Sequence, residues 1–440
     1  MNVDTTAALR AKARAILEHN AQVGVPAPDF GAGKAWLNTS RALTRSADLA
    51  GKLVLVDFWT HGCIHCTHVL PDLAYFEDKY AGEAFVVVGC HSAKFADLDA
   101  AQQVRAAVVR EGITHPVVVD VDFDIWKRFG VRAWPTLMLL SPDGRILGQV
   151  AGEGQRAVLD VLIEQALELY GALDEEVGNV LDARALPLRP ERTRELAREL
   201  CFPGKVLADA RTRSLYIADS GHNRIVVTDL DGNFVRAIGN GDAALEDGAS
   251  ESASFNAPQG LALYGGALLV ADARNHALRS IDLATGDVDT LAGNGRQGYE
   301  RARMLSAPNA SLNSPWDLCV VDGDVLIAMA GTHQLWRYDE EQQAVGPYAG
   351  DGDELKRDGA FELSSFAQPS GLAVHGERVF VADAESSSVR VLDLAARRVT
   401  TLAGASEDPR NLFCFGDEDG EGAGRRFRHP LGIAVDSVAS

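Results

Sequence analysis

Two cysteines separated by two residues form the segment of this sequence best suited to chemistry. They lie in Cys63-Ile64-His65-Cys66, at the start of residues 63–80, whose pattern predicts a helix. Side chains three positions apart on a helix are neighbours, so the two sulfurs can form a disulfide. Cys63 would lie at the helix N-terminus, where unpaired N–H groups and the helix dipole stabilise a thiolate. We therefore expect Cys63 to be the nucleophile and Cys66, which is more buried, to resolve the mixed disulfide.

A cysteine pair of this spacing also binds zinc in many proteins, so a metal site is the alternative. His61, His65, His68 and His91 could supply further ligands. A structural zinc site usually takes four ligands and a second cysteine pair, and the sequence has no second CxxC. The pattern therefore favours a redox-active dithiol with no bound metal.

The pattern around the cysteines predicts strands that alternate with helices over residues 22–152. Short apolar runs rich in β-branched residues are typical of buried strands. Ser141-Pro142-Asp143-Gly144 is a turn signal between two such runs and predicts a hairpin. This order predicts a mixed central sheet with helices on its faces, an α/β fold. The predicted strands are residues 53–58, 84–89, 116–120, 136–140 and 146–150, and the predicted helices are residues 63–80, 97–111 and 156–170.

Helical segments flank this region on both sides. Residues 1–20 predict an amphipathic helix, and residues 153–200 are helical and charged until Pro187 and Pro190 break the pattern. We therefore expect four parts in the chain. They are an N-terminal helix over residues 1–21, the α/β domain over residues 22–175, a linker over residues 176–201 and a second domain over residues 202–440.

The second domain is predicted to be built from repeats. A proline opens each unit, and successive prolines lie 54 to 61 residues apart. Within the units a second strand ending in Ala-Asp or Ala-Met, a third ending in Asp and a fourth ending in Gly recur in phase. Four short strands per unit at a nearly fixed period are typical of an all-β propeller. The opening prolines are Pro203, Pro258, Pro315, Pro369 and Pro430.

The repeat resembles the NHL family of propeller repeats. Its connecting loops match as well, because Asp247-Gly248, Asp358-Gly359 and Asp419-Gly420 each precede a unit. The third unit departs from the pattern, with Met329 where its neighbours have Asp and without an Asp-Gly in its incoming loop. Propellers of the family are expected to have six blades. Four units and the first strand of a fifth are present here, so we expect a propeller truncated in its fifth blade and a natural chain that continues.

The first domain resembles thioredoxins, and its helix at residues 97–111 brings it closer to their TlpA-like branch. The matching motifs are Val56-Asp57-Phe58-Trp59, Cys63-Ile64-His65-Cys66, Pro71 and Trp134-Pro135-Thr136. The resemblance implies that Asp57 is a buried acid that accepts a proton from the resolving cysteine, and burial would raise its pKa for that task. The alternative role of Asp57 is that of a structural carboxyl hydrogen-bonded in the core.

The same resemblance implies which residues bind the substrate. They are Trp59, Trp134 and Pro135, and a cis peptide bond at Pro135 would present the backbone of Trp134 to an extended substrate strand. A positive charge on His65 would favour the thiolate, which predicts a dithiol more oxidising than that of thioredoxin. Gly62 replaces the tryptophan that thioredoxins often carry before the first cysteine, which argues against an ordinary thioredoxin substrate range.

A thioredoxin-like domain followed by such a propeller resembles the family of NHL repeat-containing protein 2 over nearly the whole chain. The resemblance implies a thiol-disulfide oxidoreductase without a cofactor, whose propeller is a protein-interaction module. A second hypothesis is a non-enzymatic binding scaffold in which the thioredoxin-like domain is only a platform. A third is a metal-dependent lyase or lactonase in the propeller, which rests on fold analogy alone. His222, His276, His333 and the repeated Asp residues recur at similar places in successive units, so we expect them to fix loops and not to bind a metal.

Composition restricts the partners and the location. The net charge of −20 argues against nucleic acid and against anionic membranes, both of which require clusters of Lys and Arg. The sequence has no apolar stretch long enough to span a bilayer and no secretion signal, so we expect a cytoplasmic protein. The expected partner is a protein or a protein disulfide substrate, and the oligomeric state is left open. Cys201, Cys319 and Cys414 are expected to be small buried side chains. Cys90, at the end of a strand beside His91, is either a third redox cysteine or, as we expect, a buried core thiol.

Overall fold

The computed structural model describes residues 3–31, 34–95, 100–191, 198–404 and 406–436. The chain divides into two compact units, residues 1–195 and residues 196–440. None of the described helices is long and apolar enough to cross a membrane.

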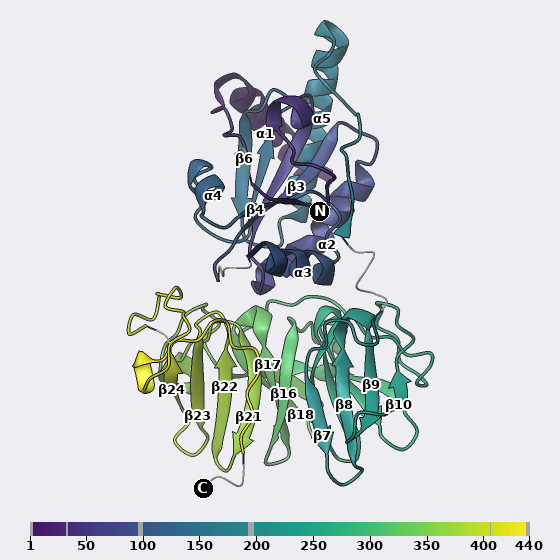
Figure 1. Ribbon diagram of the computed structural model, residues 1–440, viewed down its shortest axis with the longest axis vertical. Helices are drawn as coiled ribbons and strands as arrows, with labels where there is room; N and C mark the ends of the chain where they lie inside the picture. Colours follow the sequence, from purple (N-terminus) through teal and green to yellow (C-terminus); the bar gives the residue numbers. More distant parts are fainter. Residues whose placement is uncertain (1–2, 32–33, 96–99, 192–197, 405, 437–440) are drawn as a thin grey trace. The chain divides into compact units, whose positions relative to one another are not determined.

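A mixed sheet forms the centre of the first unit (Figure 1). Its strands are β1 (Trp36–Leu37), β2 (Leu53–Trp59), β3 (Phe85–Ser92), β4 (Val117–Asp120), β5 (Thr136–Leu140) and β6 (Ile146–Ala151). They lie in the order β1-β4-β3-β2-β5-β6, with β2, β3 and β4 parallel and the other pairs antiparallel. The helices are α1 (Val3–Val23), α2 (Ile64–Lys79), α3 (Ala100–Glu111), α4 (Asp124–Arg128) and α5 (Arg156–Val177), with a π-turn at Arg45–Leu49.

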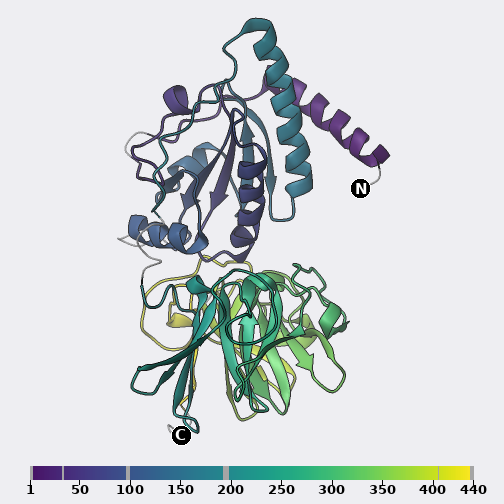
Figure 2. The same cartoon turned by 90° about the vertical axis from the view of Figure 1, so that its right-hand side faces the viewer.

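Alternation along β2 divides the interior of this unit between the two faces of the sheet. Leu53 and Leu55 pack in one cluster with side chains of α1, α2 and α5, whereas Val54 and Val56 pack on the other face with residues of α4. The helices α1 and α5 lie side by side (Figure 2). Every residue of β2 is buried, which explains why its sequence is a continuous apolar run with Asp57 as its one charged member.

The predicted strands and helices of this unit are all present, and the boundaries differ by a few residues. Residues 97–99 of the helix predicted over 97–111 lie outside the described part. The short elements α4 and β1 were not predicted, because five or two residues are too few to show a period. Residues 179–191, which fall in the predicted linker, are bound to the first unit: the buried Lys52 ammonium donates to the carbonyl oxygens of Asp182 and Arg184.

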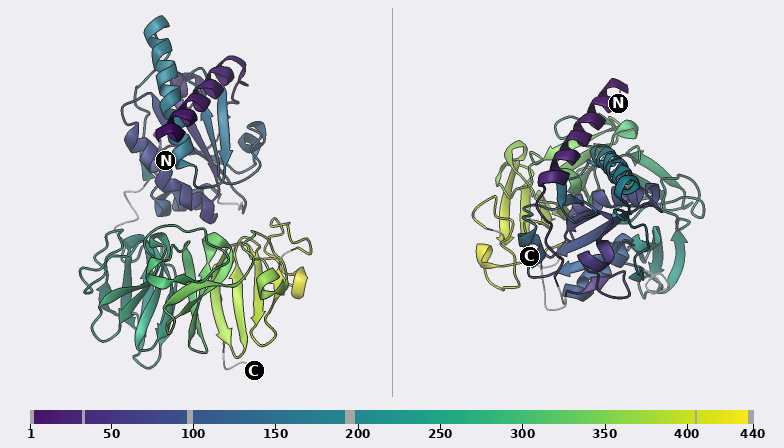
Figure 3. Two further views of the ribbon diagram at one scale, coloured as in Figure 1. Left: turned by 180° about the vertical axis from the view of Figure 1, so that it is seen from behind. Right: turned by 90° about the horizontal axis from the view of Figure 1, so that it is seen from above.

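The second unit contains four antiparallel sheets side by side, as expected for a propeller (Figures 1 and 3). The first is β7 (Val206–Asp209), β8 (Ser214–Asp219), β9 (Arg224–Asp229) and β10 (Phe234–Ile238), and the second is β11 (Pro258–Tyr264), β12 (Ala267–Asp272), β13 (Ala277–Asp282) and β14 (Val288–Ala292). The third is β16 (Pro315–Val321), β17 (Asp324–Met329), β18 (Gln334–Asp339) and β19 (Ala344–Ala349), with β15 (Leu305–Ser306) paired to β19. The fourth is β21 (Pro369–His375), β22 (Arg378–Asp383), β23 (Ser388–Asp393) and β24 (Arg398–Gly404), with β20 (Gly359–Ala360) paired to β24.

The last residue of the second strand in each sheet is a buried hydrogen-bond acceptor. It receives the backbone N–H of the residue two positions before the proline of its own unit. Asp219, Asp272 and Asp383 accept through carboxylate oxygens at 2.7 to 2.8 Å. In the third unit the Met329 Sδ atom accepts from the Asn313 N–H at 3.3 Å. Met329 therefore makes the same kind of contact as the aspartates of the other sheets, but it carries no negative charge.

An arginine explains why the Asp and the Asp-Gly loop occur together. In the second sheet the buried Arg279 binds both Asp272 and Asp247 of the incoming loop, at 2.9 and 2.8 Å. In the fourth sheet Arg390 joins Asp383 and Asp358 in the same way. The position of this arginine in the third sheet holds Trp336, which is fully buried. The third unit therefore lacks all three charged partners, because a buried charge without its counterion is costly.

A second repeated contact joins neighbouring sheets. In the first three sheets a residue with positive φ follows the short turn after the second strand, and its side chain accepts a backbone N–H from the next unit. Asn223 accepts from Ala257, His276 from Ser314 and His333 from Gln368, at 3.0 to 3.1 Å. His276 and His333 fix loops, as their recurrence predicts. His222 is not at the equivalent position: the first sheet has Asn223 there, and His222 pairs with Asp219.

The segment expected to open a fifth unit does not form a strand. Residues 430–436 are irregular, because the part of the chain that the structure describes provides no second strand of a fifth sheet to pair with them. The Leu431 carbonyl oxygen accepts from the Lys205 ammonium at 2.5 Å, and the same ammonium lies 3.3 Å from Asp317 Oδ2. Asp317 stands where the neighbouring units have Gly260 and Gly371.

The charged cluster of the fourth sheet yields a first prediction. Asp383→Met alone leaves the buried Arg390 with only the partly exposed Asp358 as its counterion and should lower the free energy of unfolding of the second unit by about 3 kcal/mol. Asp383→Met combined with Arg390→Trp copies the third sheet and should recover most of that loss. Urea unfolding of the native protein, of each single variant and of the double variant measures both effects. A double variant that loses the sum of the two single losses would contradict this explanation of the third unit.

Candidate active site

The two cysteines lie at the beginning of α2. Cys63 is the N-cap residue, partly exposed, and its Sγ atom accepts the Cys66 N–H at 3.4 Å. Cys66 is buried, and the two thiols are not bonded to each other. Gly62 has a φ of +91°, which glycine adopts at no steric cost, so a tryptophan at this position would be strained. Cys63 is therefore the outer cysteine at the helix N-terminus and Cys66 is the inner, more buried one, as the sequence predicts.

The inner cysteine, Cys66, is held in an environment that keeps it protonated. Burial raises the pKa of the Cys66 thiol well above its ordinary value, and the neighbouring Cys63 and Asp57 raise it further. Such a thiol needs a base before it can act as a nucleophile. Asp57 has the same strand parity as Leu55 and Trp59, so its side chain is on the face of the sheet that α2 covers.

Asp57 is buried without a hydrogen-bond partner. Its exposed fraction is 1%, and neither carboxylate oxygen has a partner among the described residues. Burial raises the pKa of Asp57 to about 7, and the charge of His115 opposes that rise. The alternative of a carboxyl satisfied by hydrogen bonds in the core therefore does not describe Asp57. A carboxyl with this pKa can exchange a proton near neutral pH.

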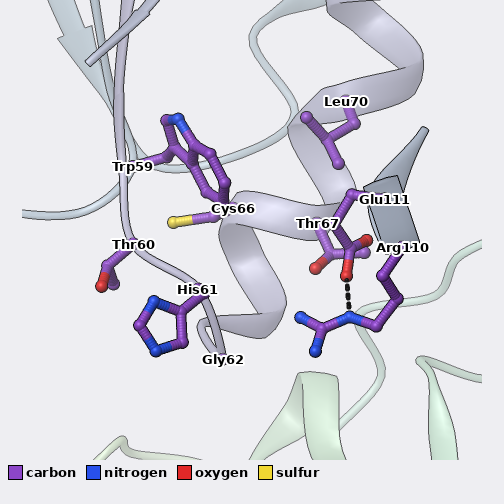
Figure 4. A pocket seen from close by; sticks show the side chains of 9 residues that line it. All are labelled: Trp59, Thr60, His61, Gly62, Cys66, Thr67, Leu70, Arg110 and Glu111. Carbon is purple, nitrogen blue, oxygen red and sulfur yellow. Dashed lines mark hydrogen bonds and ion pairs between the residues drawn. The ribbon is translucent and has the colours of Figure 1, made fainter. Parts of the chain in front are cut away.

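A small pocket lies beside Cys66 (Figure 4). In Figure 4 the Cys66 sulfur points toward Trp59 and Thr60, which follow one another at the end of β2. Trp59 is 2% exposed and packs edge-on against His91, with the ring centroids 4.6 Å apart. Trp59 is thus mostly a core residue, and it borders on Cys66 at this pocket. The complete lining is Trp59, Thr60, His61, Gly62, Cys66, Thr67, Leu70, Arg110 and Glu111.

The Trp134–Pro135 peptide bond is cis, the conformation that the resemblance implied. Pro135 is buried and opens the turn into β5, whereas Trp134 is partly exposed. The Trp134 ring packs against Trp126 with centroids 4.5 Å apart and against Phe123 at 5.9 Å. These rings hold the segment in place, and the binding of a substrate strand to its backbone stays a prediction.

His65 has a partner that the sequence did not reveal. Its Nδ1 atom lies 3.0 Å from Glu153 Oε2, and His68, three positions later on α2, binds the same oxygen. Burial raises the pKa of Glu153, but the hydrogen bonds from the two imidazoles outweigh it, so the pKa lies well below its usual range. Glu153 is therefore ionised, and it places a negative charge against both imidazoles beside the dithiol. It follows β6, far from the cysteines in the sequence, so spacing gave no signal.

The other histidines near the cysteines are engaged in pairs. His61, just before Gly62, lies with its Nδ1 atom 2.9 Å from His91 Nε2, and the two rings are stacked. Burial lowers the pKa of His91 well below its ordinary value, and the charge of His61 lowers it further, so His91 is neutral. His65, His68 and Glu153 place one ligand atom each within 4.8 Å of one another. Among the described residues no cysteine belongs to a group of this kind.

The remaining cysteines lie apart from the dithiol. Cys90 is fully buried on β3, and it packs with Phe58 and Val118 on the face opposite the one that Asp57 occupies. Burial raises the pKa of Cys90 well above its ordinary value, so it is a poor nucleophile. Cys201 and Cys319 are buried as expected. Cys414 is only partly buried, contrary to expectation, because it follows β24 in an irregular segment.

Comparison with known proteins agrees with both halves of this description. Residues 51–146 match a family model described as thioredoxin-like, and residues 312–338 match one described as NHL repeat. Over 142 residues, 32% of this chain and 94% of that protein, the sequence is 27% identical to thiol-disulfide oxidoreductase YkuV of Bacillus subtilis.

Two longer relatives match nearly the whole chain. Protein SUPPRESSOR OF QUENCHING 1, chloroplastic, of Arabidopsis thaliana is 45% identical over 94% of this chain and 40% of its own length. NHL repeat-containing protein 2 of Homo sapiens is 39% identical over 93% of this chain and 59% of its own length. The chain thus spans between two fifths and three fifths of these relatives. It belongs to the family of NHL repeat-containing protein 2, in which a thioredoxin-like domain precedes an NHL-repeat β-propeller.

Proposed function

We propose that this chain is a thiol-disulfide oxidoreductase that acts through Cys63 and Cys66, and that its propeller binds a protein partner or substrate. The observation that carries the proposal is the pairing of a buried thiol with a buried carboxyl that has no hydrogen-bond partner. Cys66 needs a base to become a nucleophile, and Asp57, with a pKa of about 7, is suited to be that base. A platform that only bound proteins would have no use for an unpaired buried carboxyl, which costs stability.

The first step is the attack of the Cys63 thiolate on one sulfur of a substrate disulfide. A Cys63–substrate disulfide forms, the substrate S–S bond breaks, and the other substrate sulfur leaves as a thiolate. Cys63 is suited to this step because it is partly exposed and its Sγ atom already accepts the Cys66 N–H at the helix N-terminus. Positive charge on His65, favoured by Glu153, would stabilise the thiolate and make the dithiol more oxidising.

The second step releases the substrate. Asp57 takes the proton of Cys66, whose thiolate attacks Cys63 Sγ. The Cys63–Cys66 bond forms, and the second substrate sulfur leaves as a thiolate. The substrate has then gained the two electrons that the dithiol has lost, and the proton of Cys66 remains on Asp57. The same steps in reverse oxidise a substrate dithiol.

Two features of the chain support a protein as the substrate. The segment before β5 could pair with an extended strand through the backbone of Trp134, next to the cis Pro135. NHL repeats and thioredoxin-like domains are generally protein-binding folds. The expected cytoplasmic location stays a prediction, and the name of the Arabidopsis thaliana relative assigns that protein to the chloroplast.

The cysteine variants test the proposal directly. Cys63→Ser should reduce the rate of insulin disulfide reduction to background, because the first bond cannot form. Cys66→Ser should trap a mixed disulfide with a peptide disulfide substrate, visible by mass spectrometry as a Cys63 adduct. Cys414→Ser, which removes another partly exposed thiol, is the matched control and should keep full activity. Full activity of Cys63→Ser would contradict the proposed role of Cys63, whereas a native protein that does not reduce insulin disulfides would favour the scaffold hypothesis.

The carboxyl is tested by pH. Asp57 can accept a proton only when ionised, so the rate of the second step should rise as the pH increases through about 7. Asp57→Asn should slow that step by about 10²-fold at pH 7.5 and remove its inflection near pH 7. Stopped-flow measurement of substrate release between pH 5 and pH 9 gives the profile. An unchanged profile in the variant would mean that Asp57 is not the base.

The same carboxyl should also affect stability. The pKa of Asp57 in the folded protein, about 7, lies above the value of about 3.9 in an unfolded chain. The folded state therefore holds this proton longer, and stability falls as the pH rises from about 4 through 7. Asp57→Asn cannot ionise, so at pH 8 it should be more stable than the native protein by about 4 kcal/mol. Urea unfolding at pH 4.5 and pH 8 should show the gain at pH 8 only.

A further inference from the structure

The proposed mechanism leaves a proton on a carboxyl that water does not reach. Asp57 is 1% exposed, and after each turnover its proton must leave the interior before the site can work again. The route from Asp57 to solvent is therefore a separate question from the identity of the base. Three other polar side chains of the first unit, those of Trp59, His115 and Glu77, are relevant to this route.

Two buried ring nitrogens close to Asp57 lack hydrogen-bond partners among the described residues. They are Trp59 Nε1 and His115 Nε2. Asp57 pairs in register with Gly89 on β3. A Cβ atom at Gly89 would lie 3.1 Å from Trp59 Nε1 and 3.4 Å from His115 Nε2. The two nitrogens therefore flank Gly89 on the face that carries the Asp57 side chain.

The far side of the His115 ring leads toward the surface. Its Nδ1 atom lies 3.4 Å from Glu77 Oε2, and the side chain of Glu77 is 29% exposed whereas that of His115 is 4% exposed. His115 itself is fixed in place, because its carbonyl oxygen accepts from the buried Asn38 side chain and the next residue, Pro116, accepts the Gly89 N–H. An imidazole that faces a buried acid with one nitrogen and a surface carboxylate with the other can pass a proton between them.

We propose that His115 is a proton relay, which carries the proton of Asp57 through a bound water to Glu77 and so to solvent. The water would accept from Trp59 Nε1 and join Asp57 to His115 Nε2. Buried polar atoms are normally satisfied, and a buried water typically makes about three hydrogen bonds. The proton moves from Asp57 to His115 Nε2 while the Nδ1 proton passes to Glu77, so the ring ends neutral and flips its tautomer back between turnovers.

This inference rests on the proposed function, so its test separates the two. The probe is the aromatic disulfide 5,5′-dithiobis(2-nitrobenzoate), applied to the full chain carrying Cys414→Ser. Attack by Cys63 releases one thionitrobenzoate, and attack by Cys66 on the mixed disulfide releases a second. The first phase reports on Cys63, and the second reports on the proton transfer from Cys66. Repeated cycles with a dithiol reductant report on the return of the site to its starting protonation state.

His115→Gln keeps a polar side chain of similar size but cannot carry a proton through the ring. We expect it to slow repeated cycles about tenfold at pH 7, because the proton of Asp57 then leaves slowly, and to leave the first phase within about twofold. The pH midpoint of the second phase should shift upward, because the charge of His115 opposes the rise in the pKa of Asp57. The other titratable groups around Asp57 are Cys63 and Cys66 on α2 and, on the opposite face of β3, Cys90. All three are unchanged in this variant.

The surface end of the route provides a variant that is safe for folding. Glu77→Gln should slow repeated cycles about threefold or more and leave single-turnover release of the first thionitrobenzoate unchanged. Asp78→Asn removes the same charge from the next residue of α2, which is exposed, and should have no effect. A merely structural role of His115 would lower stability and alter both phases without moving the pH midpoint.

The outcomes divide clearly. If Asp57→Asn slows the second phase while His115→Gln and Glu77→Gln leave its rate, its pH midpoint and the cycling rate unchanged, the relay is wrong and the proposed base stands. If Asp57→Asn has no effect either, the proposed mechanism itself fails. If His115→Gln does not fold, Glu77→Gln against Asp78→Asn decides, since equal cycling rates of these two variants would overturn the relay.

Discussion

The burial of one unpaired carboxyl is the constraint on which the site depends. Asp57 lies in a strand whose other members are all apolar, so the sheet and the helix that covers it keep water away from both Asp57 and Cys66. The same exclusion of water raises the pKa of the acid toward neutrality and the pKa of the thiol far above it. A base and its target are thus created by one physical cause, the cost of burying charge. The protein bears that cost in stability at a position where an apolar residue would pack better.

Around Cys63, in the outer part of the site, the charged groups are paired, in contrast to the buried Asp57. Glu153 serves two imidazoles at the start of α2, and His61 lies against the neutral His91. Charge around Cys63 is therefore set by residues from α2, β3 and the segment after β6, which the fold brings to one end of the sheet. The spacing of the two cysteines is common, and the side chains around them distinguish this dithiol from others.

The propeller shows how a repeat tolerates a departure when its partners change together. The charged cluster of Arg390, Asp383 and Asp358 recurs in the second sheet but is absent from the third. There the Met329 sulfur accepts the backbone N–H that an aspartate accepts in the other sheets, and Trp336 occupies the position of the arginine. The second and fourth sheets thus have an ion cluster where the third sheet has an apolar pair. This is expected where the cost of desolvating the charges and their Coulomb attraction nearly cancel.

By itself the sequence determined the α/β domain, the repeating sheets and the places of Cys63, Cys66 and Asp57 in helix and strand, because periodicity and short-range spacing are local properties. It misassigned His222 as the repeat equivalent of His276, since a shift of one residue at a turn is invisible until the positive φ of Asn223 is known. It also left Cys90 undecided, and only strand parity placed that thiol on the opposite face. Glu153, His115 and Glu77 escaped notice because Glu153 lies far in sequence from His65, and His115 lies far from both Asp57 and Glu77. Their contacts arise from packing across the sheet, and only the tertiary structure decides which distant side chains lie near the dithiol and the buried Asp57.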